Sequence, residues 1–238
     1  ILNLPLKKIW FNNLVPHLDD NKNKQDLCFI IQPSVIIDNG IEFVYYLRKK
    51  YNGKVALVLG DRVGIYPESF NIENLRKIVD IICTYNPVDS KKYGIPLHPS
   101  MVYSLKIKEE IPFKDRENDV FSIGQEKGRG KEITEVFRRC NELGLKCDFI
   151  LVGECSSSKC DGIKYVNWMP YDQVFERIKH AKCILNILQP GASGITLRDS
   201  EAYNLGCFLL TNNYAKEQDT IFNEGQVILI NELNHRVA

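Results

Sequence analysis

Three charged residues stand together in an otherwise apolar stretch late in the sequence: Arg198, Asp199 and Glu201. They follow a loop of small residues, "QPGASGIT", and precede the apolar run "CFLLTNN". Glycines in such a loop leave room for a ligand, and the N–H groups at the start of the following helix attract anions. Because Ser193 and Glu201 are a little over two helical turns apart, they could contact opposite ends of one bound molecule.

A second loop with similar chemistry is "GQEKGRGK", which follows an apolar run and enters an amphipathic one. It begins at Gly124 and carries Lys127, Arg129 and Lys131. The glycines let a phosphate approach the backbone, and the basic side chains and the helix N-terminus would neutralise its charge. The spacing matches neither the Walker A motif nor the dinucleotide-binding fingerprint, so a phosphate site and a solvated turn both stay open.

Short apolar runs alternate with amphipathic stretches along the chain, which is typical of β-α units on a parallel sheet. In the first half this predicts strands over 26–32, 54–60 and 78–85 and a helix over 39–51. In the second half it predicts strands over 119–124, 146–153, 162–168, 182–189, 207–213 and 226–231, and helices over 131–144, 171–181 and 196–206. The fold class expected is therefore α/β, with two Rossmann-like domains.

The charged segment "KIKEEIPFKDREN" has no sustained apolar period, which indicates a linker over 106–118. It separates a first domain over 1–105 from a second domain over 119–238. The first domain is small, and a truncation could account for its size. Ligands of such sheets bind at the carboxyl ends of the strands. The loops to examine there are 124–130, 153–162, 168–171 and 189–196.

Composition limits the classes of function. The chain holds 31 Lys and Arg against 30 Asp and Glu, so its bulk charge does not favour nucleic acid as a partner. Neither a membrane-spanning run nor a secretory core is present in the sequence given, so a cytoplasmic location is expected. Most of the 8 cysteines lie in apolar runs, and Cys155 and Cys160 lack further zinc ligands at suitable spacing. No metal site is predicted.

Four motifs resemble, in order, the nucleotide-sugar-binding domain of glycosyltransferases with the GT-B fold: "DVFSIGQEKGR", "CDFILVG", "GIKYVNWMPYDQVFERIKHAKCILNI" and "GASGITLRDSEAYNLGCFLLTNN". They are most similar to family 4 and related bacterial capsule and lipopolysaccharide enzymes. The resemblance implies two domains facing a cleft, with the acceptor side in 1–105 and the donor side in 119–238. It implies a metal-independent hexosyltransferase that uses a nucleotide-diphosphate sugar and no cofactor, in agreement with the lack of a D-x-D pair in a suitable loop.

The resemblance also assigns roles. Glu201 would accept hydrogen bonds from the ribose, and Lys127 would contact the diphosphate. Backbone N–H groups at 193–195 would bind the phosphates, and the loop 168–170 would border the base. The expected donor-binding set is Gly124, Lys127, Arg129, Trp168, Met169, Pro170, Ser193, Gly194, Ile195, Thr196 and Glu201, with Lys127, Arg129 and Glu201 as catalytic candidates.

Two positions depart from the family pattern. Ser193 stands where a glutamate often lies, and Gln125 stands where an arginine often follows the strand glycine; Arg129 could supply that cation. Three functions therefore stay open. One is sugar transfer to a glycan or lipid-linked acceptor of a bacterial surface polysaccharide; the others are a catalytically silent nucleotide-sugar-binding subunit and a nucleotide-sugar epimerase.

In the first half, Asp61, Arg62, Asp89 and His98 lie at expected strand ends or in loops. Each is a candidate for a catalytic base or an acceptor-binding group, with a surface or capping role as the alternative. The expected helix 39–51 ends in three cations, which either cap its C-terminus or rest on an anionic membrane at the inner face of the plasma membrane.

Overall fold

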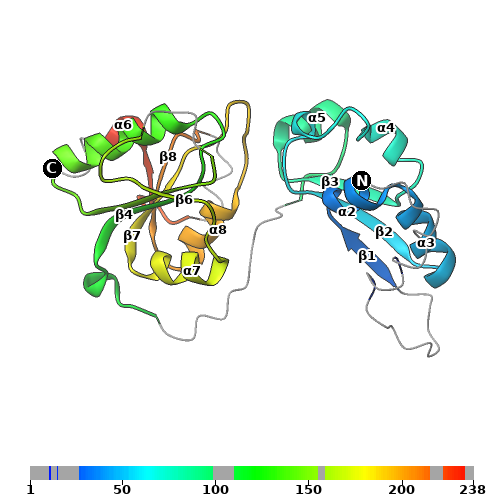
Figure 1. Ribbon diagram of the computed structural model, residues 1–238, viewed down its shortest axis with the longest axis horizontal. Helices are drawn as coiled ribbons and strands as arrows, with labels where there is room; N and C mark the ends of the chain where they lie inside the picture. The colour runs from blue at the N-terminus through cyan, green and yellow to red at the C-terminus, as the bar shows by residue number, and fades with distance from the viewer. Residues whose placement is uncertain are drawn as a thin grey trace. The chain divides into compact units, whose positions relative to one another are not determined.

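The computed structural model describes residues 11, 15, 27–98, 110–154, 159–214 and 222–233. The chain divides into two compact units, Ile1–Ser100 and Met101–Ala238, and each is built on a parallel sheet with helices (Figure 1). The predicted α/β class with two Rossmann-like units is confirmed. Residues 106–109 of the expected linker lie outside the described residues. The 3-10 helix η3 (Phe113–Asp115) occupies part of the remainder.

Unit 1 contains a three-stranded parallel sheet in the order β1-β2-β3. Its strands are β1 (Cys28–Ile31), β2 (Lys54–Leu59) and β3 (Ile81–Thr84). The helices are α2 (Pro33–Asn39), α3 (Glu42–Tyr51), α4 (Ile72–Leu75) and α5 (Pro87–Tyr93), and the 3-10 helix η2 (Val63–Ile65) follows β2. The predicted strands and the helix at 39–51 are present. The sequence analysis missed α2, α4 and α5, because these helices are too short to show an apolar period.

Helix α3 packs on the sheet of unit 1. Val44 and Leu47 are fully buried in the core, and the guanidinium of Arg48 donates to the Ile78 carbonyl and pairs with Asp80 at 2.8 Å. Arg48 and Lys50, which donates to the Tyr46 hydroxyl at 2.9 Å, therefore have partners within unit 1, as in the structural alternative. Lys49 is exposed, and membrane contact stays a prediction. Among the described residues, no helix combines the length and apolar character needed to cross a membrane.

Unit 2 contains a six-stranded parallel sheet in the order β6-β5-β4-β7-β8-β9. Its strands are β4 (Asn118–Gln125), β5 (Cys147–Val152), β6 (Lys164–Val166), β7 (Ala181–Asn186), β8 (Phe208–Thr211) and β9 (Val227–Leu229), followed by η5 (Ile230–Glu232). The chain winds outward from β4 to β6 and then returns to the other side of β4 with β7. This is the doubly wound Rossmann order, whose ligand crevice opens between β4 and β7 at the carboxyl ends of the strands.

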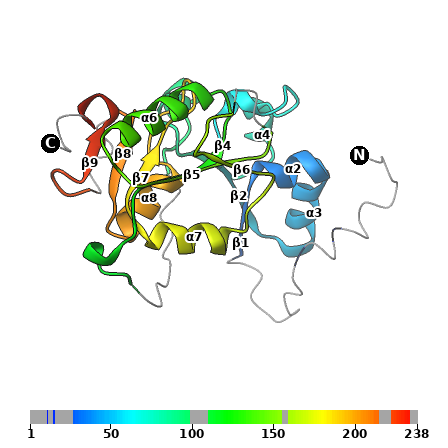
Figure 2. The ribbon, with the colours of Figure 1, turned by 60° about the vertical axis from the view of Figure 1, so that its left-hand side comes forward.

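Helices cover both faces of this sheet. Helix α6 (Gly130–Glu142) lies on one face, and α7 (Tyr171–Lys179) and α8 (Leu197–Asn204) lie on the other (Figures 1 and 2). Apolar spacing explains the packing of α6: Ile133, Val136, Phe137 and Cys140 repeat every three or four residues and are all buried. Every strand and helix predicted for this half is present within three residues of its predicted ends.

Candidate functional site

Two of the loops singled out by the sequence meet at the switch point of unit 2. The loop 126–129 joins β4 to α6, and the loop 187–196 joins β7 to α8. Between them lies a cavity of about 30 Å³, the space of a single water molecule or oxygen atom. Its lining residues are Ser122, Ile123, Gly124, Arg129, Ile133, Leu185, Asn186, Ile187 and Arg198.

Arg129 ties the two loops together. Its guanidinium donates to the carbonyl oxygens of Gln125 at 2.6 Å, Glu126 at 3.2 Å and Ile187. Burial lowers the pKa of Arg129, and the nearby charge of Arg198 lowers it further. Because two like charges lie close together beside the cavity, an anion between them would be favoured.

Asp199 fixes the start of α8. Its Oδ2 accepts hydrogen bonds from the Thr196 N–H at 2.7 Å, the Thr196 hydroxyl at 2.6 Å and the Asn186 side-chain amide at 2.9 Å. Thr196 and Asp199 form a capping box, and Asn186 ends the neighbouring strand β7. The fully buried Asp199 therefore locks the first turn of α8 onto the sheet. The sequence analysis missed this role, although the T-x-x-D spacing could have indicated it.

Glu201 is held by two partners in the interior. Its Oε1 accepts a hydrogen bond from the Tyr171 hydroxyl at 2.8 Å, and its Oε2 pairs with Arg198. The residue is only 1% exposed. A carboxylate can accept about four hydrogen bonds, so capacity for a ribose hydroxyl remains, although the side chain must first become accessible. The ribose role of Glu201 stays a prediction.

The loop before α8 offers backbone donors. Gly191 and Gly194 have φ angles of 76° and 85°, which favour glycine. The Asn213 amide donates to the Gly194 carbonyl at 3.1 Å, and the Leu188 N–H donates to Asn212 Oδ1 at 2.8 Å, so the end of β8 holds the loop in place. Within the described ranges, the N–H groups of Gly194 and Ile195 have no hydrogen-bond partner.

Lys127 lies at the tip of the β4–α6 loop in an uncommon backbone conformation. Its φ is 44° and that of Gly128 is 77°, and the side chain of Lys127 is exposed. Left-handed conformations of residues other than glycine are strained and cluster at ligand-binding loops. The loop thus presents a cation and a turned backbone at the edge of the switch point.

The predicted base-bordering loop is linked to Glu201. Trp168 is 73% exposed, Met169 packs against the core, and Pro170 caps the N-terminus of α7. The next residue, Tyr171, contributes the hydroxyl that contacts Glu201. The structure therefore brings this loop close to α8 and leaves the indole ring of Trp168 open to stack on a planar ligand.

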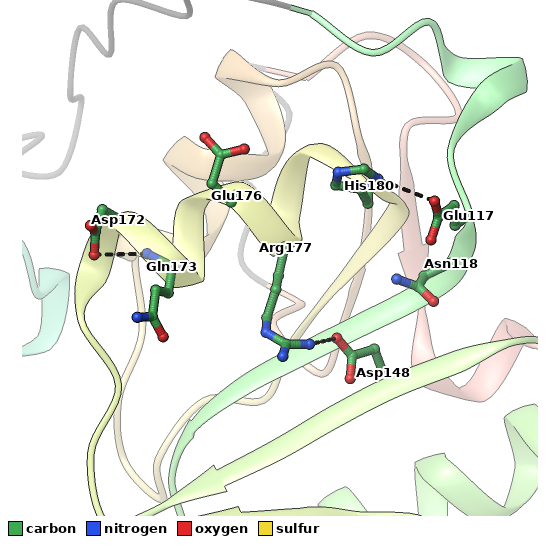
Figure 3. Close-up of a pocket in the computed structure, with 8 residues that line it drawn as sticks. All are labelled: Glu117, Asn118, Asp148, Asp172, Gln173, Glu176, Arg177 and His180. Atoms are coloured by element: carbon green, nitrogen blue, oxygen red, sulfur yellow. Dashed lines mark hydrogen bonds and ion pairs between the residues drawn. The ribbon is translucent and has the colours of Figure 1, made fainter.

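A larger hollow of about 580 Å³ runs along α7 toward the amino ends of β4 and β5 (Figure 3). It is lined by Glu117, Asn118, Asp148, Asp172, Gln173, Glu176, Arg177 and His180. The buried Asp148 is already paired with Lys164 at 2.7 Å and Arg177 at 2.8 Å. Because parallel sheets of this class bind ligands at the opposite edge, we assign no site to this hollow.

The remaining predicted positions are the candidates in unit 1 and the cysteines considered as metal ligands. In unit 1, Asp61, Arg62 and Asp89 gather at the ends of β2 and β3, while the exposed His98 donates its backbone N–H to the Thr84 carbonyl. Cys155 lies outside the described residues. Among the residues that are described, no group of three or more His, Cys, Asp or Glu side chains could hold a metal ion.

A family described as "Glycosyl transferase-like" matches residues 131–238, from α6 onward. This match supports the predicted glycosyltransferase resemblance for most of unit 2. Curated protein sequences gave no match.

A comparison with solved structures gave matches that include the following three. The complex of accessory secretory proteins 1, 2 and 3 from Streptococcus pneumoniae has a TM-score of 0.52 at 10% identity, covering 96% of this chain and 48% of that one. An alpha-glucosyltransferase in complex with UDP and DNA has a TM-score of 0.49 at 10% identity, with 77% and 60% covered. A protein described as a UDP-N-acetylglucosamine 2-epimerase from Listeria monocytogenes has a TM-score of 0.45 at 9% identity, with 89% and 65% covered. The chain therefore spans about half to two thirds of their length.

Proposed function

We propose that the chain binds a nucleotide-diphosphate sugar at the switch point of unit 2 and transfers the sugar to a glycan or lipid-linked acceptor of a bacterial surface polysaccharide. The family match over 131–238 supports glycosyl transfer. The observation that carries the donor site is the pair of guanidiniums, Arg129 and Arg198, beside one oxygen-sized cavity. The N–H groups of Gly194 and Ile195 and the cation of Lys127 would add donors for the rest of the diphosphate.

In this reaction the acceptor oxygen bonds to the anomeric carbon as the bond from that carbon to the diphosphate oxygen breaks, and the acceptor hydroxyl proton passes to the leaving diphosphate or to water. The transition state resembles an oxocarbenium ion, and negative charge grows on the leaving diphosphate. Arg129 spends three of its five N–H donors on backbone carbonyls, which holds it in place with donors to spare. Donors that are fixed before the reaction stabilise the leaving group without reorganisation.

We further propose that donor binding exchanges an internal ion pair. Arg198 would turn from Glu201 toward the diphosphate, and the released Glu201 carboxylate would then accept a hydrogen bond from the ribose. The burial of Glu201 and its pairing with Arg198 support this order. A nucleoside without phosphates cannot draw Arg198 away, so it should bind far more weakly than its diphosphate.

Turnover of a panel of UDP-, GDP- and dTDP-sugars tests the proposal. Release of nucleoside diphosphate that persists in EDTA is the expected result, because side chains and backbone would meet the phosphate charge. Conversion of the sugar without nucleotide release would instead identify an epimerase. Binding without any turnover would identify a silent subunit, the alternative kept open by Ser193 and Gln125. Turnover lost in EDTA and restored by Mg²⁺ or Mn²⁺ would contradict metal independence.

We propose a cytoplasmic location, with contact at the inner face of the plasma membrane if the acceptor is lipid-linked. The exposed Lys49 of α3 is the cation to test, because Arg48 already pairs with Asp80. Wild-type protein should sediment with anionic vesicles at low salt, and Lys49→Gln should reduce this. Equal, negligible sedimentation of both proteins would remove the membrane proposal.

A further inference from the structure

One strand of unit 1, β1, lies at the lateral border of its sheet (Figure 1). Among the described residues, β2 lies on one side of β1 and no strand lies on the other. The strand has the sequence CFII, without a charged residue or a proline, and its register with β2 contains no bulge. Proteins commonly protect border strands with such devices, because unpaired backbone groups there pair with other chains. The strand β1 uses none of them.

Two residues of β1 direct their backbone groups to the free side of the strand. The Lys54 N–H donates to the Leu27 carbonyl at 2.8 Å, and Cys28 is the register partner of Lys54. In a parallel ladder this pattern turns alternate residues toward the neighbouring strand. Phe29 therefore faces β2, whereas Cys28 and Ile30 each direct an N–H and a carbonyl away from it. In the described part of the chain, nothing bonds to these outward groups.

The free side of β1 is also apolar. The side chain of Ile30 is 74% exposed, and Cys28 is exposed as well. A groove of about 460 Å³ runs along the strand and is bordered by α2 and α3. Its lining residues are apolar except for Asn39, whose amide already donates to the Val35 carbonyl at 3.0 Å. The groove therefore suits apolar side chains and offers little to a charged ligand.

A second copy of β1 matches both the backbone groups and the groove. When two such strands run antiparallel about a twofold axis at Phe29, Cys28 of one copy lies opposite Ile30 of the partner subunit. The outward N–H groups of each copy then meet the outward carbonyls of the other. Side chains that lie opposite each other share one face of the sheet. Phe29, which contacts the Tyr51 ring of α3 at 5.5 Å, thus lies beside Phe29 of the partner subunit on the face that carries the groove.

We propose that two copies of this chain pair through β1 in antiparallel orientation, which joins the two unit 1 sheets into one. No charge on the strand repels its own copy, and the twofold axis closes the pairing at two chains. A four-residue strand with one groove is smaller than a standard interface, so the dimer is weak and forms at high protein concentration. The proposal rests on unit 1 and is independent of glycosyl transfer.

Sedimentation velocity of the full-length chain, from about 10 µM to about 1 mM, tests the pairing. We expect the sedimentation coefficient of the wild type to rise with concentration. Ile30→Lys places a charge at the interface and should weaken association about tenfold or more. Val88→Lys adds the same charge at a position of α5 that is 56% exposed, so it is the matched control and should associate like the wild type. Cys28→Lys, at the other outward residue, repeats the test if circular dichroism shows that Ile30→Lys is not folded.

Amide hydrogen exchange, followed by nuclear magnetic resonance on the same chain, shows what covers β1. The Phe29 N–H faces β2 and should be protected at every concentration. Protection of the Cys28 and Ile30 N–H groups should be low in the monomer and rise as the dimer forms. Protection of both groups in the monomer would show that another segment of the same chain covers the strand, and would overturn the proposal. Absence of self-association up to about 1 mM would overturn it as well, as would wild-type association of a folded Ile30→Lys.

Discussion

The carboxyl edges of the two sheets differ in how many of their charged side chains already have partners. In unit 2, Arg129, Asp199 and Glu201 are bonded to backbone groups or to other side chains. In unit 1, Arg62 and the carboxylate of Asp61 have no such partners among the described residues. The edge in unit 2 is thus assembled before a ligand arrives, and a ligand must exchange with internal partners. At the edge in unit 1, the hydrogen-bonding capacity of Arg62 and of the Asp61 carboxylate is unused among the described residues.

The largest effect expected from this comparison is on stability in unit 2. Asp199→Ala should lower the free energy of unfolding by about 2–4 kcal/mol, because it removes one half of the capping box and takes from the Thr196 N–H and from the buried Asn186 amide the carboxylate that they share, although the amide keeps the Thr196 hydroxyl as an acceptor. Urea unfolding followed by far-ultraviolet circular dichroism measures the loss. The exposed Asp161→Ala should change stability by about 0.5 kcal/mol or less. Equal, small effects of both changes would show that the bonds at this edge do not support the fold.

A smaller effect should appear in unit 1 at high pH. Burial raises the pKa values of Tyr66 and Tyr85 to about 12, above the unfolded value of 10. Because the folded state holds these protons more tightly, their stabilisation is complete below about pH 10 and is lost as the pH rises toward about 12. Ionisation of each tyrosine should lower the free energy of unfolding by about 1–2 kcal/mol, a figure that allows for solvent screening at these partly exposed positions.

Unfolding of the wild type and of Tyr85→Phe, compared at about pH 8 and about pH 11.5, measures this pH dependence. The variant lacks one of the two titrating phenols and should show a shallower decline. Identical declines would mean that Tyr85 ionises as easily in the folded chain as in the unfolded one.

The smallest effect should be the stability change on altering the open edge of unit 1. Asp61→Asn should shift the free energy of unfolding by about 0.5 kcal/mol or less, since its carboxylate bonds to no described residue. Thermal unfolding of Asp61→Asn, compared with that of the control Asp38→Asn at an exposed position of α2, measures this shift. A loss of unfolding free energy as large as that of Asp199→Ala would contradict the difference between the two edges.

Periodic patterns made most of the fold predictable. Helix α6 repeats its buried residues at helical spacing, and the strands of unit 2 are continuous apolar runs, as buried parallel strands are. Helices α2 and α5 have 7 residues each, so no period could reveal them. Local signals could have revealed these two helices, because each begins with a proline, Pro33 or Pro87, and Asn86 caps the second helix.

The site was predictable in its residue types but not in its contacts. The loop glycines, Lys127 and Glu201 stand out in the sequence. The hydrogen bond between Tyr171 and Glu201 joins residues 30 positions apart, and it depends on how α7 and α8 pack on one face of the sheet. Similarly, Arg129 was expected as a cation for the phosphate, whereas its bonds to three carbonyls follow from the adjacency of β4 and β7.

The central claim is that a nucleoside diphosphate binds between Arg129 and Arg198, and calorimetry tests it most directly. Titration of the full-length chain with UDP, GDP and dTDP would compare the wild type, Arg198→Lys and the exposed control Arg138→Lys. Lysine keeps the charge that pairs with Glu201 but lacks the guanidinium fork. We predict binding of at least one diphosphate, weakened about tenfold in Arg198→Lys and unaltered in the control. No binding of any of the three at millimolar concentration, or equal affinities of the wild type and Arg198→Lys, would contradict the account.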